Sequence, residues 1–275
     1  MMPKTIQRDD LKVALCISGQ MRTHLSCLGS WHRAFLARYN PEVFIHTWTD
    51  AGPGARYEKV SEDQLVGQYL VRGVEIEEKT EGYNYKIGNI SVPEALIRAE
   101  PRHSRNTLPM LYSMHRADAL RRRYEKTYGF EYDLVIKCRP DVQFFGPPLR
   151  LKKMPPGQIY LEACYLDIRY LASDKFAYGS SSAMNKYSRT FELLEVYWQD
   201  PIGDGAWGNI LSDERLMKHH LKTTGLKQRI APILFFIRRT REMRWSQEKF
   251  EEMKSVQRLA KNALFTLTTH TEIKL

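Results

Sequence analysis

Three short, mostly apolar runs constrain the fold of this chain more than any other feature of its sequence. They cover residues 12–18, 42–48 and 132–138. Each run is as long as a β-strand and lacks the alternation of a strand with one wet face, so each predicts a strand covered on both faces. Helical patterns separate the runs. This order predicts an α/β fold with a mostly parallel, Rossmann-like central sheet flanked by helices.

The remaining elements are predicted from periodicity and from residues that start or stop helices. We expect helices at residues 28–39, 61–70, 107–128, 181–198 and 212–223, and further strands at residues 73–77 and 158–162. Ser61 is placed to cap its helix. Residues 79–105 are polar and rich in turn formers, which predicts a long loop of the kind that often serves as a lid.

The distribution of charge suggests two parts. The net charge is +10, and residues 227–261 hold ten Lys or Arg against four Glu. We therefore expect a catalytic domain at residues 1–226 and a basic, amphipathic, helical tail at residues 227–275. The tail's apolar run at residues 233–237 lies beside arginines, which fits peripheral docking on an anionic membrane surface. It fits packing against the domain equally well.

Two further features bear on location. The first ten residues have no apolar core, and no apolar run approaches the length of a bilayer span. The four cysteines show no metal-binding spacing, so we expect reduced, mostly buried thiols. Both features favour a cytoplasmic protein.

The first candidate site follows the first apolar run and includes Ser18, Gly19 and Arg22. A glycine at the carboxyl end of a parallel strand lets the backbone approach a ligand, and an arginine can pair with phosphate through two hydrogen bonds. The segment has no standard dinucleotide or Walker motif. Taken alone, it fits a turn with a surface arginine better than a binding loop.

The second candidate site, Arg139-Pro140-Asp141, follows the third apolar run. Proline lacks an amide donor and stiffens the end of the strand. The flanking side chains would then lie at the rim of the sheet, where a carboxylate can bind a divalent cation and a guanidinium can neutralise a diphosphate. A turn with a surface ion pair explains the tripeptide equally well.

Five segments carry a resemblance to a known family. They are 14–23 (ALCISGQMRT), 42–48 (EVFIHTW), 132–141 (YDLVIKCRPD), 173–180 (SDKFAYGS) and 212–217 (SDERLM). In content and order they resemble GT-A glycosyltransferases of bacterial and viral surface-polysaccharide pathways. The resemblance covers roughly residues 12–222. It implies a GT-A-type fold and transfer of a sugar from a nucleotide-diphosphate sugar to a glycan or lipid-linked acceptor.

The resemblance also implies roles for individual residues. Ser18, Gly19 and Arg22 match the loop near the nucleotide, and Arg139 lies beside the diphosphate. Asp141 matches the second acid of the metal-binding DxD motif and would hold Mn²⁺ or Mg²⁺. This chain departs from the motif because Arg139 replaces the first acid. Asp174 and Glu214 match acids on the acceptor side. Glu214 is the first choice for a catalytic base, with Asp174 and Asp213 as substitutes.

Other residues have simpler interpretations. His46 is most simply a hydrogen-bonded core histidine, Arg121 to Arg123 a solvated helix end, and His219 with His220 a surface pair. A non-enzymatic basic module that binds nucleic acid or an anionic membrane is the main alternative function, although no nucleic-acid-binding motif is present and we expect no nucleic-acid partner. A methyltransferase or sulfotransferase would need a glycine-rich or P-loop-like cradle, which the sequence lacks.

Overall fold

The computed structural model describes the backbone of residues 11–50, 59–78, 86–87, 90–91, 101–162, 172, 174–199 and 213–238. Side chains are described for these residues except 86–87, 90–91, 101–105, 198–199 and 213–215. All three apolar runs are strands near the middle of one sheet, as predicted. Cys164 and residues 239–275 of the predicted helical tail lie outside the described residues.

The central sheet of the described chain has seven strands. In sheet order they are β10 (Lys227–Ile230), β8 (Gln158–Leu161), β9 (Phe176–Gly179), β6 (Leu134–Cys138), β1 (Val13–Ser18), β2 (Glu42–Trp48) and β3 (Val71–Glu77). β9 runs antiparallel to its two neighbours, and the other neighbouring pairs are parallel. The predicted mostly parallel sheet is therefore confirmed.

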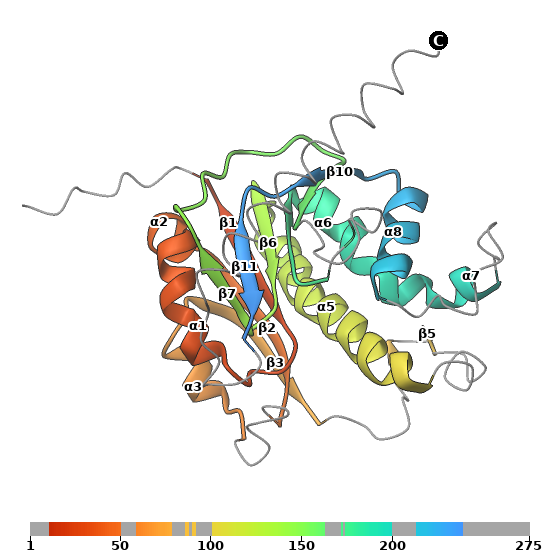
Figure 1. Ribbon diagram of the computed structural model, residues 1–275, viewed down its shortest axis with the longest axis horizontal. Helices are drawn as coiled ribbons and strands as arrows, with labels where there is room; N and C mark the ends of the chain where they lie inside the picture. The colour runs from red at the N-terminus through yellow and green to blue at the C-terminus, as the bar shows by residue number, and fades with distance from the viewer. Residues whose placement is uncertain are drawn as a thin grey trace, which may run out of the picture.

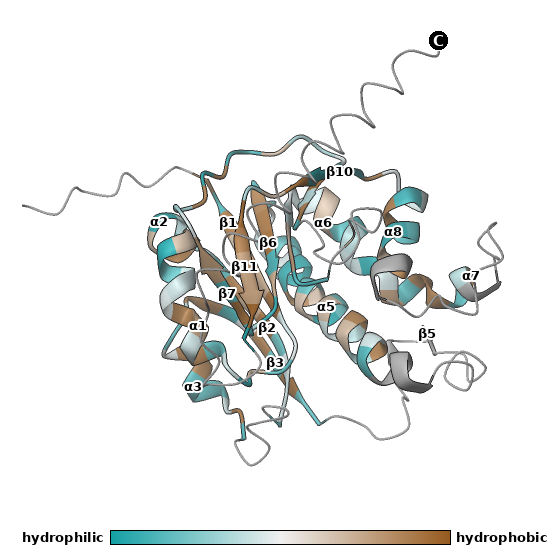
Figure 2. Ribbon diagram, viewed as in Figure 1, coloured by the Kyte–Doolittle hydropathy of each residue, from teal (hydrophilic) through white to brown (hydrophobic). Residues whose placement is uncertain are grey.

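Helices cover both faces of this sheet (Figure 1). On one face lie α1 (His24–Trp31), the π-helical turn η1 (His32–Leu36), α2 (Ala37–Tyr39) and α3 (Glu62–Val66). On the other lie α5 (Pro101–Tyr128), α6 (Ser181–Tyr187), the 3-10 helix η2 (Ser188–Leu193), α7 (Leu194–Gln199) and α8 (Asp213–Thr223). Figure 2 shows the apolar strands between these partly polar helices. The result is a three-layer α/β/α arrangement with a hydrophobic core on each face.

The side chains of β1 explain why its sequence is apolar throughout. Val13, Leu15 and Ile17 enter the core beneath α1, whereas Ala14 and Cys16 enter the core beneath α5. All five are at most 3% exposed. Successive strand residues point to opposite faces, so a strand between two helical layers must be apolar at every position. Burial also raises the pKa of the Cys16 thiol, which keeps it unreactive.

The long helix α5 begins earlier than its sequence predicts. Residues 101–105, predicted as part of a long loop, form its first turn, and Pro109 lies inside it. Pro101 has no amide to satisfy and suits a helix start. Leu108, Leu111 and Met114 are buried against the sheet. This packing outweighs the roughly 3 kcal/mol that an internal proline costs a helix.

Two polar residues predicted at the surface are buried, so those interpretations were wrong. Arg121 is 0% exposed and bonds with Asp118, Glu125, Ser181 and Asn185. His220 is also 0% exposed: it accepts from the Tyr197 hydroxyl and donates to the Lys186 carbonyl. Ser181 and Asn185 contact Arg121 from α6, and both partners of His220 lie on elements before α8, which explains why local pattern could not reveal the burial.

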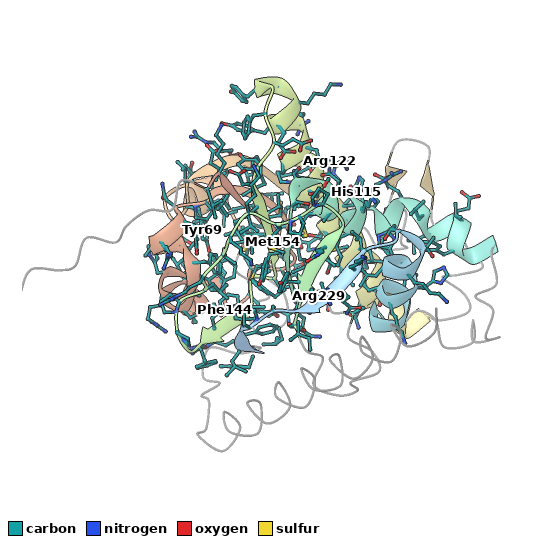
Figure 3. The ribbon with its side chains drawn as sticks, turned by 90° about the horizontal axis from the view of Figure 1, so that it is seen from above. Tyr69, His115, Arg122, Phe144, Met154 and Arg229 are labelled. Atoms are coloured by element: carbon teal, nitrogen blue, oxygen red, sulfur yellow. The ribbon has the colours of Figure 1, made fainter. Side chains whose placement is uncertain are left out.

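The same face carries a partly buried ion cluster. His115 and Arg122, which lie side by side on α5 in Figure 3, both reach Glu192 of η2, at 3.2 and 3.7 Å. Burial, despite the nearby Glu192, lowers the pKa of His115. This cluster ties α5 to η2 and lies in the helical layer.

The segment predicted as the start of a helical tail instead forms two strands up to residue 238. β10 joins the edge of the central sheet, and β11 (Leu234–Ile237) pairs antiparallel with β7 (Val142–Phe145). Phe235 and Phe236 contact Phe144 and Phe145. The apolar run at residues 233–237 therefore packs against the domain. A second short pair is β4 (Lys86–Ile87) with β5 (Ile90–Ser91).

No helix among the described residues combines the length and apolar character that crossing a bilayer requires.

Candidate active site at the carboxyl edge of the sheet

The two candidate sites meet at the edge where β1 and β6 end. These strands are parallel neighbours, and Ile17 pairs with Cys138 in register. The residues that follow each strand therefore emerge together. Gly19 has φ = +119°, a backbone conformation that is strained for any residue with a side chain. A Cβ atom on Gly19 would lie 3.6 Å from Pro140, so the two loops are in contact.

Arg139 binds the two buried aspartates of this edge. Its Nε and Nη2 donate to the two carboxylate oxygens of Asp141 at 3.0 and 2.8 Å, and its Nη1 donates to Asp174 Oδ2 at 3.4 Å. Asp141 and Asp174 are each 1% exposed, whereas the Arg139 side chain is 25% exposed. The arginine therefore lies between the two buried acids and the surface.

Arg22 comes to the same acid from the first loop. Its Nε lies 3.8 Å from Asp141 Oδ2, and its Nη2 donates to Gln20 Oε1 at 3.3 Å. Gln20 in turn donates to Asp50, which follows β2. The structure thus joins Ser18, Gly19 and Arg22 to Arg139 and Asp141 in one place. Their positions at strand ends could be predicted from the sequence, whereas their contact could not.

A third arginine reaches the site from the segment predicted as tail. The backbone amide of Arg238 donates to the Asp141 carbonyl at 2.7 Å, and its carbonyl accepts from the Thr23 hydroxyl at 2.6 Å. Its guanidinium donates to Gln143. The sequence predicts Arg238 in a separate tail, and only the pairing of β11 with β7 brings it here. The cluster of arginines after residue 237 was the only sequence signal.

Two lysines lie on the other side of Asp174. Lys175 Nζ is 3.4 Å from Glu162 Oε1 and 3.8 Å from Asp174 Oδ1. Lys137, the fourth residue of β6, is 1% exposed, and its Nζ has no hydrogen-bond partner in the part of the chain described. Burial lowers the pKa of Lys137 to about 8, against the opposing effect of Asp174. Sequence analysis missed Lys137, although a lysine within a buried strand is itself an unusual signal.

The charges around this edge favour an anion. Four cationic side chains, from Arg22, Lys137, Arg139 and Lys175, accompany three carboxylates, from Asp141, Asp174 and Glu162. Burial alone would raise the pKa of Asp174, but Lys175, Arg139 and Lys137 outweigh it and lower that pKa to about 2. Asp174 therefore stays ionised, and the site keeps an excess of positive charge.

These surroundings fit a divalent cation poorly at Asp141. Both of its carboxylate oxygens already accept hydrogen bonds from Arg139, and Arg22 lies close to one of them. A dication would have to displace one guanidinium and tolerate its neighbours. The described residues offer one group with metal-ligand geometry, His46, Glu75 and Glu77, whose ligand atoms lie within 4.8 Å of one another.

That second group is a closed hydrogen-bonded cluster. Arg116 bonds with Glu75 through two nitrogens, and Tyr112 donates to Glu77. His46, a core histidine as predicted, lies between Ser113 and Glu77 at 2.9 and 3.3 Å. The His46 hydrogen bond, despite partial burial, lowers the pKa of Glu77. Since the carboxylates already have a cation and donors, the group is explained as an internal network.

The predicted base, Glu214, is the second residue of α8. Its side chain lies outside the described residues. The helix position agrees with the sequence prediction, whereas the direction of the carboxylate stays a prediction. The other predicted catalytic acid, Asp174, lies inside the arginine and lysine cluster.

Comparison of the sequence with protein-family models and with curated proteins finds no match to either, so the function of this chain has to be argued from its site.

Proposed function

We propose that this chain is a GT-A-type glycosyltransferase that moves a sugar from a nucleotide-diphosphate sugar to a glycan or lipid-linked acceptor. The observation that carries the proposal is the placement of Arg22 and Arg139 on Asp141 at the carboxyl edge of a mostly parallel sheet. Ligands of open α/β sheets bind at this edge. An excess of guanidinium groups there suits a diphosphate.

The proposed chemistry is stabilisation of a leaving group. When the bond between the sugar and the diphosphate breaks, negative charge grows on the departing phosphate oxygen. Arg139 and Arg22 are held in place before the reaction by Asp141 and Gln20, so they can neutralise this charge with little reorganisation. A positioned carboxylate would accept the proton of the attacking acceptor hydroxyl.

Glu214 remains our choice for that carboxylate. Asp174 fits the role badly because a base with a pKa near 2 has little tendency to take up a proton at neutral pH. An acid at the start of α8 can be held in position by the free amides of the helix end. We therefore drop Asp174 as an alternative base and keep it as a binding residue.

The divalent cation implied by the family resemblance is not needed for this proposal. Mn²⁺ or Mg²⁺ would have Asp141 as its protein ligand, and the pairing of Asp141 with Arg139 works against that use. We route no step through a metal. The guanidinium groups supply positive charge at the position where the family uses the cation.

The alternative of a basic module for polymeric anions is less well supported. A nucleic acid or a membrane is bound through exposed cations that meet many phosphates. Here Lys137 is fully buried and Arg139 is mostly covered, which suits a small anion that enters a site. Membrane contact through residues 239–275 stays a separate prediction, because those residues lie outside the described chain.

A thermal-shift screen tests the proposal. UDP, GDP, CDP and ADP, each with and without its sugar conjugates, are added to the full chain in EDTA and in Mn²⁺. A ligand of the folded state raises the melting temperature. We expect at least one nucleoside diphosphate to do so, and an absence of any shift across the panel would contradict the proposal.

A further inference from the structure

Two buried polar atoms at the carboxyl edge have no hydrogen-bond partner among the described residues. One is Lys137 Nζ, and the other is Asp174 Oδ1. Lys137 lies in β6, which pairs with β9, and Asp174 lies just before β9. The Arg139 amide donates to the Lys175 carbonyl at 3.0 Å, so the two segments remain neighbours beyond the paired residues. Both residues are 1% exposed. The charge of each residue acts on the other, so the two groups lie near one another, and neither atom has a hydrogen-bond partner among the described residues.

Lys137 is not required as a counter-ion for the nearby acids. Asp174 already receives Arg139 on Oδ2 and has Lys175 at 3.8 Å from Oδ1. Glu162 pairs with Lys175. Burial of an ammonium group without an acceptor is costly, and an apolar side chain of similar length would avoid that cost. The lysine is therefore better explained by a ligand than by the fold.

The charge around Lys137 indicates the kind of ligand. Lys137 and Lys175 balance Asp174 and Glu162, so this half of the site is close to neutral. The half that contains Arg22 and Arg139 against Asp141 carries the positive excess. A phosphate belongs in the second half, because in the first it would meet the Asp174 carboxylate with no proton to donate.

A hydroxyl group matches the open pair. It can accept a hydrogen bond from an ammonium group and donate one to a carboxylate at the same time. Sugars carry such groups next to one another, whereas a diphosphate has none. The closeness of Asp174 to Arg139, at 3.4 Å, joins this neutral half directly to the proposed diphosphate site.

We propose that Lys137 and Asp174 form the subsite that binds hydroxyl groups of the sugar carried by the nucleotide donor. The inference rests on the proposed function and adds the part of the site that selects the transferred group. Arg22 and Arg139 hold the diphosphate, and Lys137 and Asp174 hold the sugar attached to it.

The test compares nucleoside diphosphates with their sugar conjugates by calorimetry. UDP and GDP are titrated into the wild type, Lys137→Met and Asp174→Asn, and so are UDP-glucose, UDP-galactose, UDP-N-acetylglucosamine and GDP-mannose. We expect each variant to bind the diphosphate within about twofold of wild type and to lose roughly tenfold or more in affinity for the preferred sugar conjugate. Lys152→Met, which removes an exposed lysine, should bind every ligand as wild type does.

A double variant sharpens the result. If both residues bind the same hydroxyl groups, Lys137→Met with Asp174→Asn should lose little more affinity for the sugar conjugate than either single change. Equal losses for diphosphate and sugar conjugate would overturn the inference and make Lys137 a phosphate ligand. Unchanged binding of every sugar conjugate would overturn it as well.

The outcomes separate the inference from the function on which it rests. If the wild type binds UDP or GDP and the variants show no selective loss, only the sugar subsite is wrong. If the wild type binds no nucleotide, the proposed function fails and the subsite fails with it. If Lys137→Met lowers the melting temperature strongly, the lysine is a structural counter-ion and the inference is wrong, whereas unchanged or higher stability supports it.

Discussion

Arg139 and Asp141 form a two-point ion pair, with Nε and Nη2 of the arginine 3.0 and 2.8 Å from the two carboxylate oxygens. The pair is only two residues apart in sequence, with Pro140 between them. Arg139 thus binds both carboxylate oxygens of the residue that the family resemblance implies as a metal ligand. Asp141 therefore positions the Arg139 guanidinium.

Asp141→Asn should leave diphosphate binding intact. The change removes the negative charge that competes with phosphate for Arg139, so we expect affinity for UDP or GDP in EDTA to be unchanged or to rise by roughly tenfold. Isothermal titration calorimetry in EDTA and in Mn²⁺ measures this. The opposite pattern, strong Mn²⁺-dependent binding that Asp141→Asn abolishes, would show that Asp141 is a metal ligand, as its sequence position predicts.

Arg22→Ala should weaken nucleoside diphosphate binding. Loss of a charge-assisted hydrogen bond is expected to cost roughly 1.5–3 kcal/mol of binding free energy. Calorimetry with the nucleotide found in the thermal-shift screen gives the value. Arg33→Ala, which removes an exposed arginine from η1, is the matched control. Equal affinity in Arg22→Ala and wild type would remove Arg22 from the site.

Glu214→Gln should lower kcat by roughly 10²–10⁴-fold while donor binding is kept, because the amide cannot accept the acceptor's proton. Asp213→Asn removes the neighbouring negative charge at the start of α8 and serves as the control. If Glu214 only stabilises the helix start, the melting temperature should fall and kcat should stay. Near-normal turnover in Glu214→Gln would therefore refute its role as base.

Lys137→Met should stabilise the protein at neutral pH. Burial lowers the pKa of Lys137 from 10.5 to about 8, so between these values the unfolded chain holds a proton that the folded chain has released. Stability of the wild type should therefore rise as pH increases through this range, by roughly 3 kcal/mol in total. Below pH 8 both states are protonated and the full penalty remains.

Urea unfolding of Lys137→Met and wild type at pH 7 and pH 10 measures this effect. The variant should be more stable at pH 7, and most of its advantage should disappear toward pH 10.5. A variant that is less stable at pH 7 would show instead that the ammonium group supports the fold through Asp174 and Glu162.

The sequence alone determined the layers of the fold. The runs that became β1, β2 and β6 are mostly apolar on both faces, as expected of strands that pack between two helical layers. The residues that follow these strands could also be identified from the sequence, because the end of an apolar run predicts the carboxyl end of its strand. Ser18, Gly19, Arg22, Arg139 and Asp141 were found in this way.

Tertiary structure decided which of those residues meet and what they do to one another. The register of β1 with β6 brings Gly19 to Pro140, and the pairing of β11 with β7 brings Arg238 to Asp141. These contacts join segments about 100 or more residues apart, so no local pattern contains them. Burial is likewise a property of the assembled layers: it separates Arg121, enclosed by acids, from Lys137, whose amine is left without a partner in the described chain. Charge and period can be read along a chain, but the surroundings that set the energy of a charged group exist only after the chain has folded.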